Sequence, residues 1–454
     1  MSISPVMQRL STYIAQAGKR KLPPAVLERT KHHVLDTIAA MVSGSRLLPG
    51  RKGIAYVKTL GGTKEACVVG SRIVTSAAHA ALANGMCAHA DETDDSHAPS
   101  VMHPGCGIVP AALAVAEREG RSGEALLRAV ALGYDVATRL TMSLNAFKFR
   151  EDGLSTHSYG PTFGAAAAAG SLVNVNDRQA RYLLSYAAQQ ASGISCWMRD
   201  EEHIEKAFDF GGMPARNGVT AATMVAQGFT GVDDVFSGER NFLVAHGRPA
   251  NPEELARGLG EDYEILRTNI KRWSVGSPIQ APLDSLAILV KEHGVKADQV
   301  EKLTIRVAHR DKNTTDNRPM PDICMQHMCA VMLFDGTVTF KSAHDEKRFR
   351  DRKVLEFRKK IDLQGDDALT KTMPARQGIV ELTLSDGRSL RHHTVAVRGT
   401  AENPMTRDEV DAKSYDLLAP VAGKARARKL CDAVWQLEKL KDVRKLRPLL
   451  QEKA

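Results

Sequence analysis

Eighteen residues of this chain, at 88–105, hold an unusual density of ionisable side chains. The segment AHADETDDSHAPSVMHPG contains three histidines and four carboxylates. Histidine can accept and donate a proton near neutral pH, because its unperturbed pKa is about 6.5, and a neighbouring carboxylate can orient the imidazole ring. We therefore consider the segment a candidate for acid–base chemistry. For Asp94, Asp95 and Ser96, helix capping is the alternative role.

The same segment also offers ligands to a metal ion, and the set to consider is His89, Asp91, Asp95 and His97. The sequence contains no HExxH, and its aspartate pair lacks the DDxxD spacing that holds magnesium in helical prenyl-transferring enzymes. We therefore expect no metal at this site and rank a metal-dependent hydrolase third among the functions considered.

Two later segments add a histidine and two cations. The first, THSYGPTFGAAAAAGSL at 156–172, places His157 before an alanine-rich run, and the second, at 203–231, carries Lys206 and Arg216. A lysine can meet a substrate carboxylate as a point charge, and an arginine can meet it as a fork. The alternatives are a structural histidine and ordinary surface charge, and surface charge is the stronger alternative for Arg216.

The elements that must position these residues are predicted to be helices throughout the first half of the chain. Apolar residues from 23 to 44 recur mostly at three- and four-residue steps, which is typical of an amphipathic helix. Similar patterns predict further helices at 75–90, 107–118, 122–140, 160–173, 177–191 and 213–227. The GAAAAAG run at 164–170 predicts that these helices approach one another closely.

The sequence pattern changes near residue 265. Alternating Leu303, Ile305 and Val307 predict a strand within 300–309, and Asp386-Gly387 predicts a hairpin turn within 379–397. With a helix near 282–293, this region should be α+β. We therefore expect a helical domain at 1–265 that is completed by 400–454, and an inserted α+β domain at 266–399.

Composition and charge indicate which kinds of partner and which compartment to expect. The 454 residues carry a formal net charge of +9, but basic residues are scattered and only 5% of residues are aromatic, so we expect no nucleic-acid partner. The positive charge instead favours small anions. Seven cysteines form no CxxC pair, which predicts a reducing compartment. With no signal-like start or membrane-length apolar run, we expect a cytoplasmic protein that does not associate with membranes.

Taken in order, these motifs resemble the MmgE/PrpD family. The family's early signature is a His, an Asp, an aromatic residue, Asp-Asp-Thr or Asp-Asp-Ser, and then His-Pro; this chain reads HADETDDSH at 89–97 and His103-Pro104. Glu92 stands where the family usually has Asp, and Thr93 replaces the aromatic residue. Further matches at 156–172, 203–231, 270–286, 325–340 and 401–413 extend the resemblance nearly from end to end.

The resemblance implies a large helical domain with a smaller α+β lid domain, a homodimer and no cofactor. Known members dehydrate 2-methylcitrate, decarboxylate cis-aconitate or epimerise iminodisuccinate, and all of these reactions move charge at a carbon next to or conjugated with a carboxylate. By this resemblance the catalytic residues are His103, His157, Lys206 and Glu92. We further expect substrate binding by Asp91, Asp95, Ser96, Lys271, Gln280 and His327, and by Arg216, which no family motif singles out and whose charge alone suggests the role.

Two of these positions also depart from the family pattern. Gln280 falls near a position where members can carry histidine, and His327 stands where tyrosine is common. We therefore expect a lyase or isomerase acting on a small di- or tricarboxylic acid, with dehydration, decarboxylation and epimerisation all open. The alternative is an inactive family member that binds a carboxylate or serves as a partner subunit.

Overall fold

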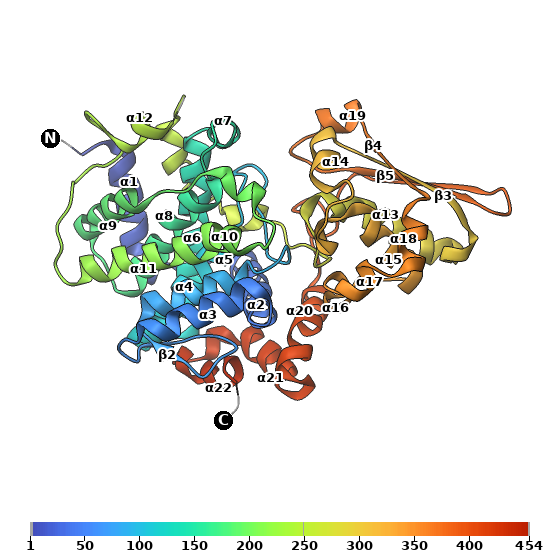
Figure 1. The fold of residues 1–454 in the computed structure, drawn as a ribbon. Coiled ribbons are helices and arrows are strands. Elements are labelled where there is room, and N and C mark those ends of the chain that lie inside the picture. Colours follow the sequence, from blue (N-terminus) through green and yellow to red (C-terminus); the bar gives the residue numbers. More distant parts are fainter. Residues whose placement is uncertain (1–2, 248, 453–454) are drawn as a thin grey trace. The chain divides into compact units, whose positions relative to one another are not determined.

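The computed structural model describes residues 3–247 and 249–452. Its chain divides into two compact units (Figure 1). Unit 1 comprises Met1–Ala90, Asp94–Thr268 and Val410–Ala454, and unit 2 comprises Asp91–Thr93 and Asn269–Glu409. Residues 1–2, 248 and 453–454 of the helical domain predicted from the sequence lie outside the described residues. The three-residue segment 91–93 thus belongs to unit 2, although both of its covalent neighbours belong to unit 1.

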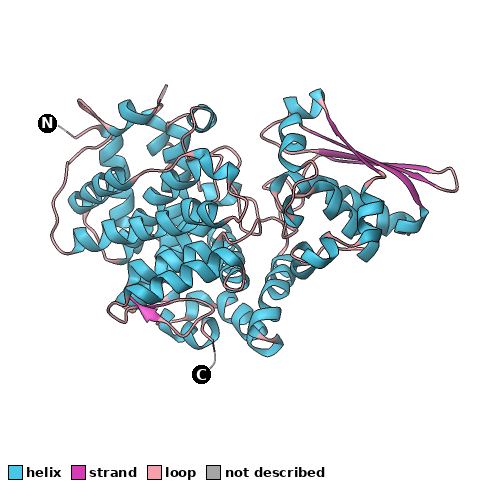
Figure 2. Ribbon diagram, in the orientation of Figure 1, coloured by secondary structure: helices cyan, strands magenta, loops and turns pink. Residues whose placement is uncertain are grey.

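The chain is mostly helical and has a small sheet (Figure 2). Unit 1 contains one two-stranded ribbon, β1 (Ala66–Cys67) and β2 (Val74–Thr75). Its helices in the first half of the chain are α1 (Pro5–Gln16), α2 (Pro24–Gly44), α3 (Leu48–Leu60), α4 (Ala77–Ala88), α5 (Gly105–Glu119), α6 (Gly123–Ser143), α7 (Ala146–Glu151), α8 (Thr156–Leu172), α9 (Asp177–Gln190), α10 (Ile204–Ala207), α11 (Met213–Ala226) and α12 (Phe242–His246). Helix α20 (Arg407–Ala422) leads from unit 2 back to unit 1, where α21 (Lys424–Trp435) and α22 (Arg447–Leu450) follow.

Small residues bring the central helices of unit 1 together, as the alanine-rich sequence predicts. A Cβ placed on Gly133 in α6 would lie 2.9 Å from the Gly164 carbonyl oxygen in α8, and one placed on Gly164 would lie 2.5 Å from the Gly133 oxygen. The two backbones are therefore in direct contact. All seventeen residues of α8 are buried, so this helix forms the centre of the unit and can hold a side chain rigidly at its first turn.

Unit 2 is built on a four-stranded sheet in the order β4-β3-β5-β6. Its strands are β3 (Val300–Val307), β4 (Ile361–Gly365), β5 (Gly378–Leu384) and β6 (Ser389–Thr394). Strand β3 pairs parallel with β4 and antiparallel with β5, and β5 and β6 form the hairpin predicted around Asp386-Gly387. The positive φ of Gly387, +83°, explains the glycine in this turn. The sequence reading missed β4, because its five residues give too short an alternating pattern.

Helices complete unit 2. They are α13 (Gln280–His293), α14 (His309–Thr315), α15 (Met325–Asp335), α16 (Phe340–Ala343), α17 (Glu346–Phe349), α18 (Arg352–Arg358) and α19 (Asp367–Lys371). The inward residues Leu303, Ile305 and Val307 of β3 share one apolar core with α13 and α15. Within the described ranges, no helix has the length and apolar character that a membrane crossing needs.

Candidate functional site

A π-helical turn, η3 (Phe208–Gly212), joins α10 to α11 and provides the centre of the candidate site in unit 1. Two glycines allow it to lie against α4: a Cβ on Gly85 would lie 2.4 Å from the Gly211 oxygen, and a Cβ on Gly211 would lie 2.1 Å from the Gly85 oxygen. Only glycine permits this backbone contact. Single π-turns inside helices are frequent at functional sites, and this one fixes the position of Phe210.

Three histidines surround Phe210 and a fourth, His203, packs against one of them, and we call these four, with Phe210 and Trp197, the histidine cluster. His89 and His157 stack on Phe210 with ring centroids 4.2 and 3.8 Å away and interplanar angles of 18° and 7°. His103 lies 5.3 Å from His157 and 5.1 Å from His89, and His203 lies 5.1 Å from His89. Residues far apart in the sequence thus share one small volume within unit 1.

Asp94 anchors two of these rings. Its Oδ2 lies 2.9 Å from Nδ1 of His89, and its Oδ1 lies 2.9 Å from Nδ1 of His103. Burial favours the neutral acid, but the charges and hydrogen bonds of the two histidines outweigh it and hold the pKa of Asp94 well below its usual range. An ionised carboxylate only accepts hydrogen bonds. Both Nδ1 atoms therefore carry protons, and Nε2 of each ring is the nitrogen that remains for proton exchange.

His157 is the second residue of α8 and experiences a different electrostatic environment. Burial, followed by the positive charges of His103, His89 and Lys206, lowers its pKa well below the ordinary value. The positive end of the α8 dipole acts in the same direction. His157 is therefore neutral at physiological pH, and within the described part of the chain its Nδ1 has no hydrogen-bond partner.

Lys206 on α10 adds a cation to the cluster. Its Nζ lies 5.3 Å from the centroid of Phe210 and 5.6 Å from that of Trp197. The structure thus brings together His103, His157 and Lys206, the three residues on which the sequence prediction placed most weight. The histidine cluster, with Asp94 and Lys206, combines one carboxylate, four imidazoles and one ammonium. This combination is suited to binding an anion and moving a proton beside it.

Asp95 points elsewhere. Its carboxylate lies 2.7 Å from Nδ1 of His33, accepts a hydrogen bond from the hydroxyl of Tyr134, and accepts one at 2.9 Å from the backbone N–H of Gly105 at the start of α5. Asp95 therefore caps α5 and ties it to α2 and α6. These contacts give it the capping role that the sequence left open. The neighbouring Ser96 is partly buried.

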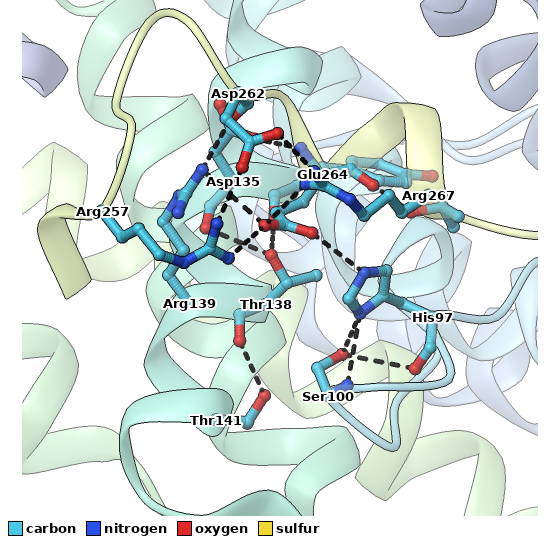
Figure 3. A network of polar contacts seen from close by, with 12 residues as sticks. His97, Ser100, Asp135, Thr138, Arg139, Thr141, Arg257, Asp262, Glu264 and Arg267 are labelled. Atoms are coloured by element: carbon cyan, nitrogen blue, oxygen red, sulfur yellow. Dashed lines mark hydrogen bonds and ion pairs between the residues drawn. The ribbon is translucent and has the colours of Figure 1, made fainter. Parts of the chain in front are cut away.

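His97 organises the loop that leads to His103 (Figure 3). Its backbone pairs with Met102, its Nδ1 lies 2.7 Å from the hydroxyl of Ser100, and its Nε2 lies 3.3 Å from a carboxylate oxygen of Glu264. The backbone N–H of Glu264 is in turn held at 2.7 Å by Asp135. These contacts close the loop at 97–102 and fix the chain immediately before His103.

Asp91 is occupied inside unit 2. Its Oδ2 lies 3.0 Å from Nε2 of His344, and it also accepts hydrogen bonds from the backbone and hydroxyl of Thr93. Burial opposes a charge on His344, but the hydrogen bond and charge of Asp91 outweigh it and raise the pKa of His344 to about 9. Because Nδ1 of His344 faces the carbonyl oxygen of Phe340 at 2.8 Å, both nitrogens of this imidazolium have acceptors.

Glu92 and Lys271 lie together in unit 2. The Nζ of Lys271 donates a hydrogen bond of 2.6 Å to the backbone oxygen of Glu92 and lies 3.8 Å from its carboxylate. Both residues are buried. Lys271 therefore holds the backbone of the segment 91–93, and a role for Glu92 in catalysis remains a prediction.

Two other predicted residues, Gln280 and Arg216, have contacts of their own. The Gln280 amide binds the backbone of Trp273 and Val275 at 2.9–3.1 Å, which closes the turn before α13. Arg216 binds the side chain of Asn217 and lies over Phe208. These contacts give Gln280 and Arg216 structural roles, so we leave both out of the proposed site.

His327 is fully buried on α15 of unit 2. Its ring lies edge-on to Phe349 with centroids 4.8 Å apart. Neither of its ring nitrogens has a hydrogen-bond partner in the described chain. A substrate-binding role for His327 therefore remains a prediction.

The metal set considered from the sequence does not assemble, because Asp91, Asp95 and His97 each have a separate partner. Within unit 1, His89, Asp94 and His103 place potential ligand atoms within 4.8 Å of one another among the described residues. Those nitrogens lie at hydrogen-bond distance from Asp94, so hydrogen bonding accounts for the geometry of the three residues.

Sequence reasoning missed Phe210, Trp197, His203 and His344, and it gave Asp94 a capping role that could coexist with a role at an anion site. The available signal was weak. His203 lies three residues before Lys206 in a matched motif, but nothing in the sequence indicates that its ring lies near His89. Contacts between residues more than one hundred positions apart, such as His89 with Phe210, are set by helix packing.

Comparison with known proteins supports one assignment. The chain matches the MmgE/PrpD N-terminal domain over residues 8–255 and the MmgE/PrpD C-terminal domain over residues 273–438. It is 23% identical to the cis-aconitate decarboxylase of Aspergillus terreus, over 98% of this chain and 96% of that protein. It is equally similar, at 23%, to the cis-aconitate decarboxylase-like protein oryM of Aspergillus oryzae, over 98% and 97% of the two chains. From these matches, which together cover most of its length, the chain belongs to the MmgE/PrpD family.

Proposed function

We propose that the protein is a lyase that acts on a small tricarboxylic acid by proton transfer next to a carboxylate. The observation that carries the proposal is the His103–Asp94 pair beside the neutral His157 and the cation of Lys206. The relatives named cis-aconitate decarboxylase support the substrate class. At 23% identity they leave decarboxylation, dehydration and epimerisation as separate outcomes of an assay.

The two central histidines differ in a way that suits two roles. The ionised Asp94 stabilises the imidazolium form of His103, so His103 is our candidate to take up and deliver the proton from Nε2. His157 stays neutral and can act as a hydrogen-bond donor toward a carboxylate or enolate oxygen. Lys206 supplies the full positive charge for a second carboxylate.

The backbone supports the same ligand chemistry. His103 directly precedes Pro104, the N-cap of α5, and His157 lies in the first turn of α8. A helix start carries partial positive charge and N–H groups without helical partners, which favour an anion. With the rings of His103 and His157 5.3 Å apart, two helix starts serve one position.

For a decarboxylation, the C–C bond to one carboxylate breaks and carbon dioxide leaves. The electron pair passes into the π-system conjugated with a second carboxylate, and a proton from His103 then quenches the carbanion at carbon. Stabilising the negative charge on that second carboxylate is the demand that His157 and Lys206 meet. Dehydration or epimerisation would instead begin with His103 removing the proton next to a carboxylate.

The test is incubation of the purified protein in deuterated water with cis-aconitate, citrate and 2-methylcitrate, followed by NMR. We expect loss of one substrate and deuterium at a carbon next to or conjugated with a carboxylate. Substituting His103→Asn should reduce turnover by about 10²–10⁴-fold, the usual contribution of a positioned acid or base, and His157→Ala should reduce it by about 10²–10³-fold, the usual contribution of an oxyanion donor. His79→Gln is the matched control, because His79 lies outside the cluster and its Nδ1 contacts the Gly61 carbonyl.

A carboxylate-binding protein without activity would bind these acids in calorimetry and show no turnover or exchange. That result would reject the proposed lyase. We further propose, from the family resemblance, that the protein acts as a homodimer without a cofactor. Sedimentation analysis and activity that persists after chelator treatment and dialysis test these two points.

A further inference from the structure

Trp197 in η2 (Ser195–Arg199) forms one side of the histidine cluster, and its indole nitrogen is the feature of interest. The indole ring lies edge-on to Phe210, with centroids 4.7 Å apart at 90°, and edge-on to His157, with centroids 5.4 Å apart at 89°. Only 7% of Trp197 is exposed. The ring is therefore part of the packed cluster, and its position is set by the same residue, Phe210, that positions the histidines.

The buried Nε1 of Trp197 has no hydrogen-bond partner in the part of the chain that the structure describes. An indole N–H can only donate. Leaving such a donor buried without an acceptor costs about 1–3 kcal/mol. A protein tolerates that cost where a ligand supplies the acceptor.

The surroundings of the ring indicate which acceptor this is. The cations that lie nearest the indole among the described contacts are Lys206, 5.6 Å from the ring centroid, and Arg150, 5.8 Å away. Both are donors only. Two further nitrogens of the cluster, Nδ1 of His157 and Nε2 of His89, are also buried without a described partner. The indole N–H and the two cations beside it can only donate, so their complement is an anion that presents oxygen acceptors.

The other two tryptophans show the contrast. The indole nitrogen of Trp273 donates to Asp284 at 3.1 Å, and that of Trp435 donates to Asp411 at 2.7 Å. Both are satisfied by carboxylates of the chain itself. Trp197 has the same donor group in a buried position but no such carboxylate among the residues that the structure describes.

We propose that the indole N–H of Trp197 binds a carboxylate of the substrate, as the uncharged donor beside Lys206. The inference rests on the proposed function and adds a substrate-binding residue to it. Because the indole does not titrate, its contact would persist at every pH at which the protein is folded, unlike those of the histidines. The contact adds affinity and orientation, while His103 retains the proton transfer.

The test is binding of propane-1,2,3-tricarboxylate, a saturated analogue of cis-aconitate, to the wild-type protein and to Trp197→Phe. Phenylalanine keeps an aromatic ring against Phe210, but it is smaller than the indole and removes the donor together with part of the ring contact. We expect the dissociation constant measured by calorimetry to rise about tenfold or more, as for loss of a hydrogen bond to a charged group. For cis-aconitate turnover, KM should rise similarly while kcat changes less than threefold. Met198→Leu, next to it in the sequence and exposed, is the control.

A second measurement does not depend on how well the variant folds. The wild-type protein should give three indole N–H resonances in ¹⁵N–¹H spectra, and adding the analogue should move only one of them substantially. That resonance should be absent from the spectrum of Trp197→Phe. It can also be assigned by elimination, as the one that belongs to neither Trp273 nor Trp435.

The outcomes separate the two proposals. If the wild-type protein binds and converts substrate but Trp197→Phe has an unchanged dissociation constant, or if no indole resonance moves on binding, the role of Trp197 is wrong and the lyase proposal stands. If the wild-type protein neither binds the analogue nor converts any acid, both fail.

Discussion

The imidazole of His103 and the carboxylate of Asp94 are joined by a hydrogen bond of 2.9 Å from Nδ1 to Oδ1. The carboxylate is fully buried and holds His89 through its other oxygen. Burial would raise the pKa of Asp94, but the charges and hydrogen bonds of the two histidines outweigh this effect and hold the pKa well below its usual range. Asp94 is therefore ionised throughout the physiological pH range. His103 is thus held in one orientation and one tautomer.

Replacing Asp94 by Asn should strongly reduce activity. An amide presents both a donor and an acceptor to Nδ1, so His103 is no longer held in the tautomer that leaves Nε2 as the base. We expect kcat to fall about 10²–10⁴-fold with a smaller change in KM. Steady-state kinetics measure this, with Asp152→Asn in the exposed Lys148 ion pair as the control. Wild-type kcat in Asp94→Asn would rule out the positioning role.

Replacing Gly85 by Ala should disturb the site through the contact between α4 and the π-helical turn. The new Cβ would lie 2.4 Å from the Gly211 backbone oxygen, so α4 and the π-turn would have to separate. We expect a loss of about 1–3 kcal/mol in the free energy of unfolding, as for other overpacked positions, with a fall in kcat as Phe210 shifts. Thermal unfolding and kinetics check this. Gly18→Ala is the control, since its Cβ would meet only the Ser171 oxygen at 3.8 Å; equal stability of the two variants would contradict the expectation.

Replacing His344 by Gln should change how stability depends on pH. The folded pKa of about 9 lies above the unfolded value near 6.5, so the contribution of this histidine is complete below pH 6.5 and is lost as pH rises toward 9. On the acid side, burial by itself would raise the pKa of Asp91, but the hydrogen bond and charge of His344 outweigh burial and lower it. The pair therefore weakens only once Asp91 is protonated.

We therefore expect the wild-type protein to exceed His344→Gln by about 3 kcal/mol between pH 4 and 6.5, with the difference shrinking above that range. Denaturant unfolding across pH measures it. His309→Gln, in the exposed pair with Asp367, is the control and should show little difference. A gap that does not depend on pH would show that His344 stabilises unit 2 only by packing.

Replacing His327 by Leu should have the opposite pH signature. Burial, and then the charges of Arg358 and Arg348, lowers the pKa of His327 to about 4. Below pH 6.5 the unfolded chain binds a proton that the folded chain does not, so wild-type stability falls by about 1.4 kcal/mol per pH unit down to pH 4. The leucine variant lacks this loss and should become progressively more stable relative to the wild-type protein as pH falls. Parallel stability curves would contradict the buried, neutral state of His327.

Local sequence was sufficient for the main helices, for most of the sheet and for three of the ionisable residues of the site. The three- and four-residue apolar periods predicted the helix that precedes His103 and a helix at 160–173, because one face of each helix must be buried; the structure begins the second helix earlier, at Thr156, so that it also carries His157. Alternation in 300–307 and the Asp386-Gly387 turn predicted two parts of the sheet for the same kind of reason. The order of the family motifs along the sequence was enough to indicate His103, His157 and Lys206.

Only the tertiary structure decided how adjacent residues divide their roles. Asp94 turns to His89 and His103, Asp95 turns to His33 and Tyr134, and Asp91 pairs with His344. A carboxylate has the same chemistry at each of these positions, so the sequence cannot distinguish a catalytic anchor from a helix cap or an ion pair. Tertiary packing supplies that information. It places Phe210 against His89, more than one hundred positions away, and Trp197 against His157, forty positions away.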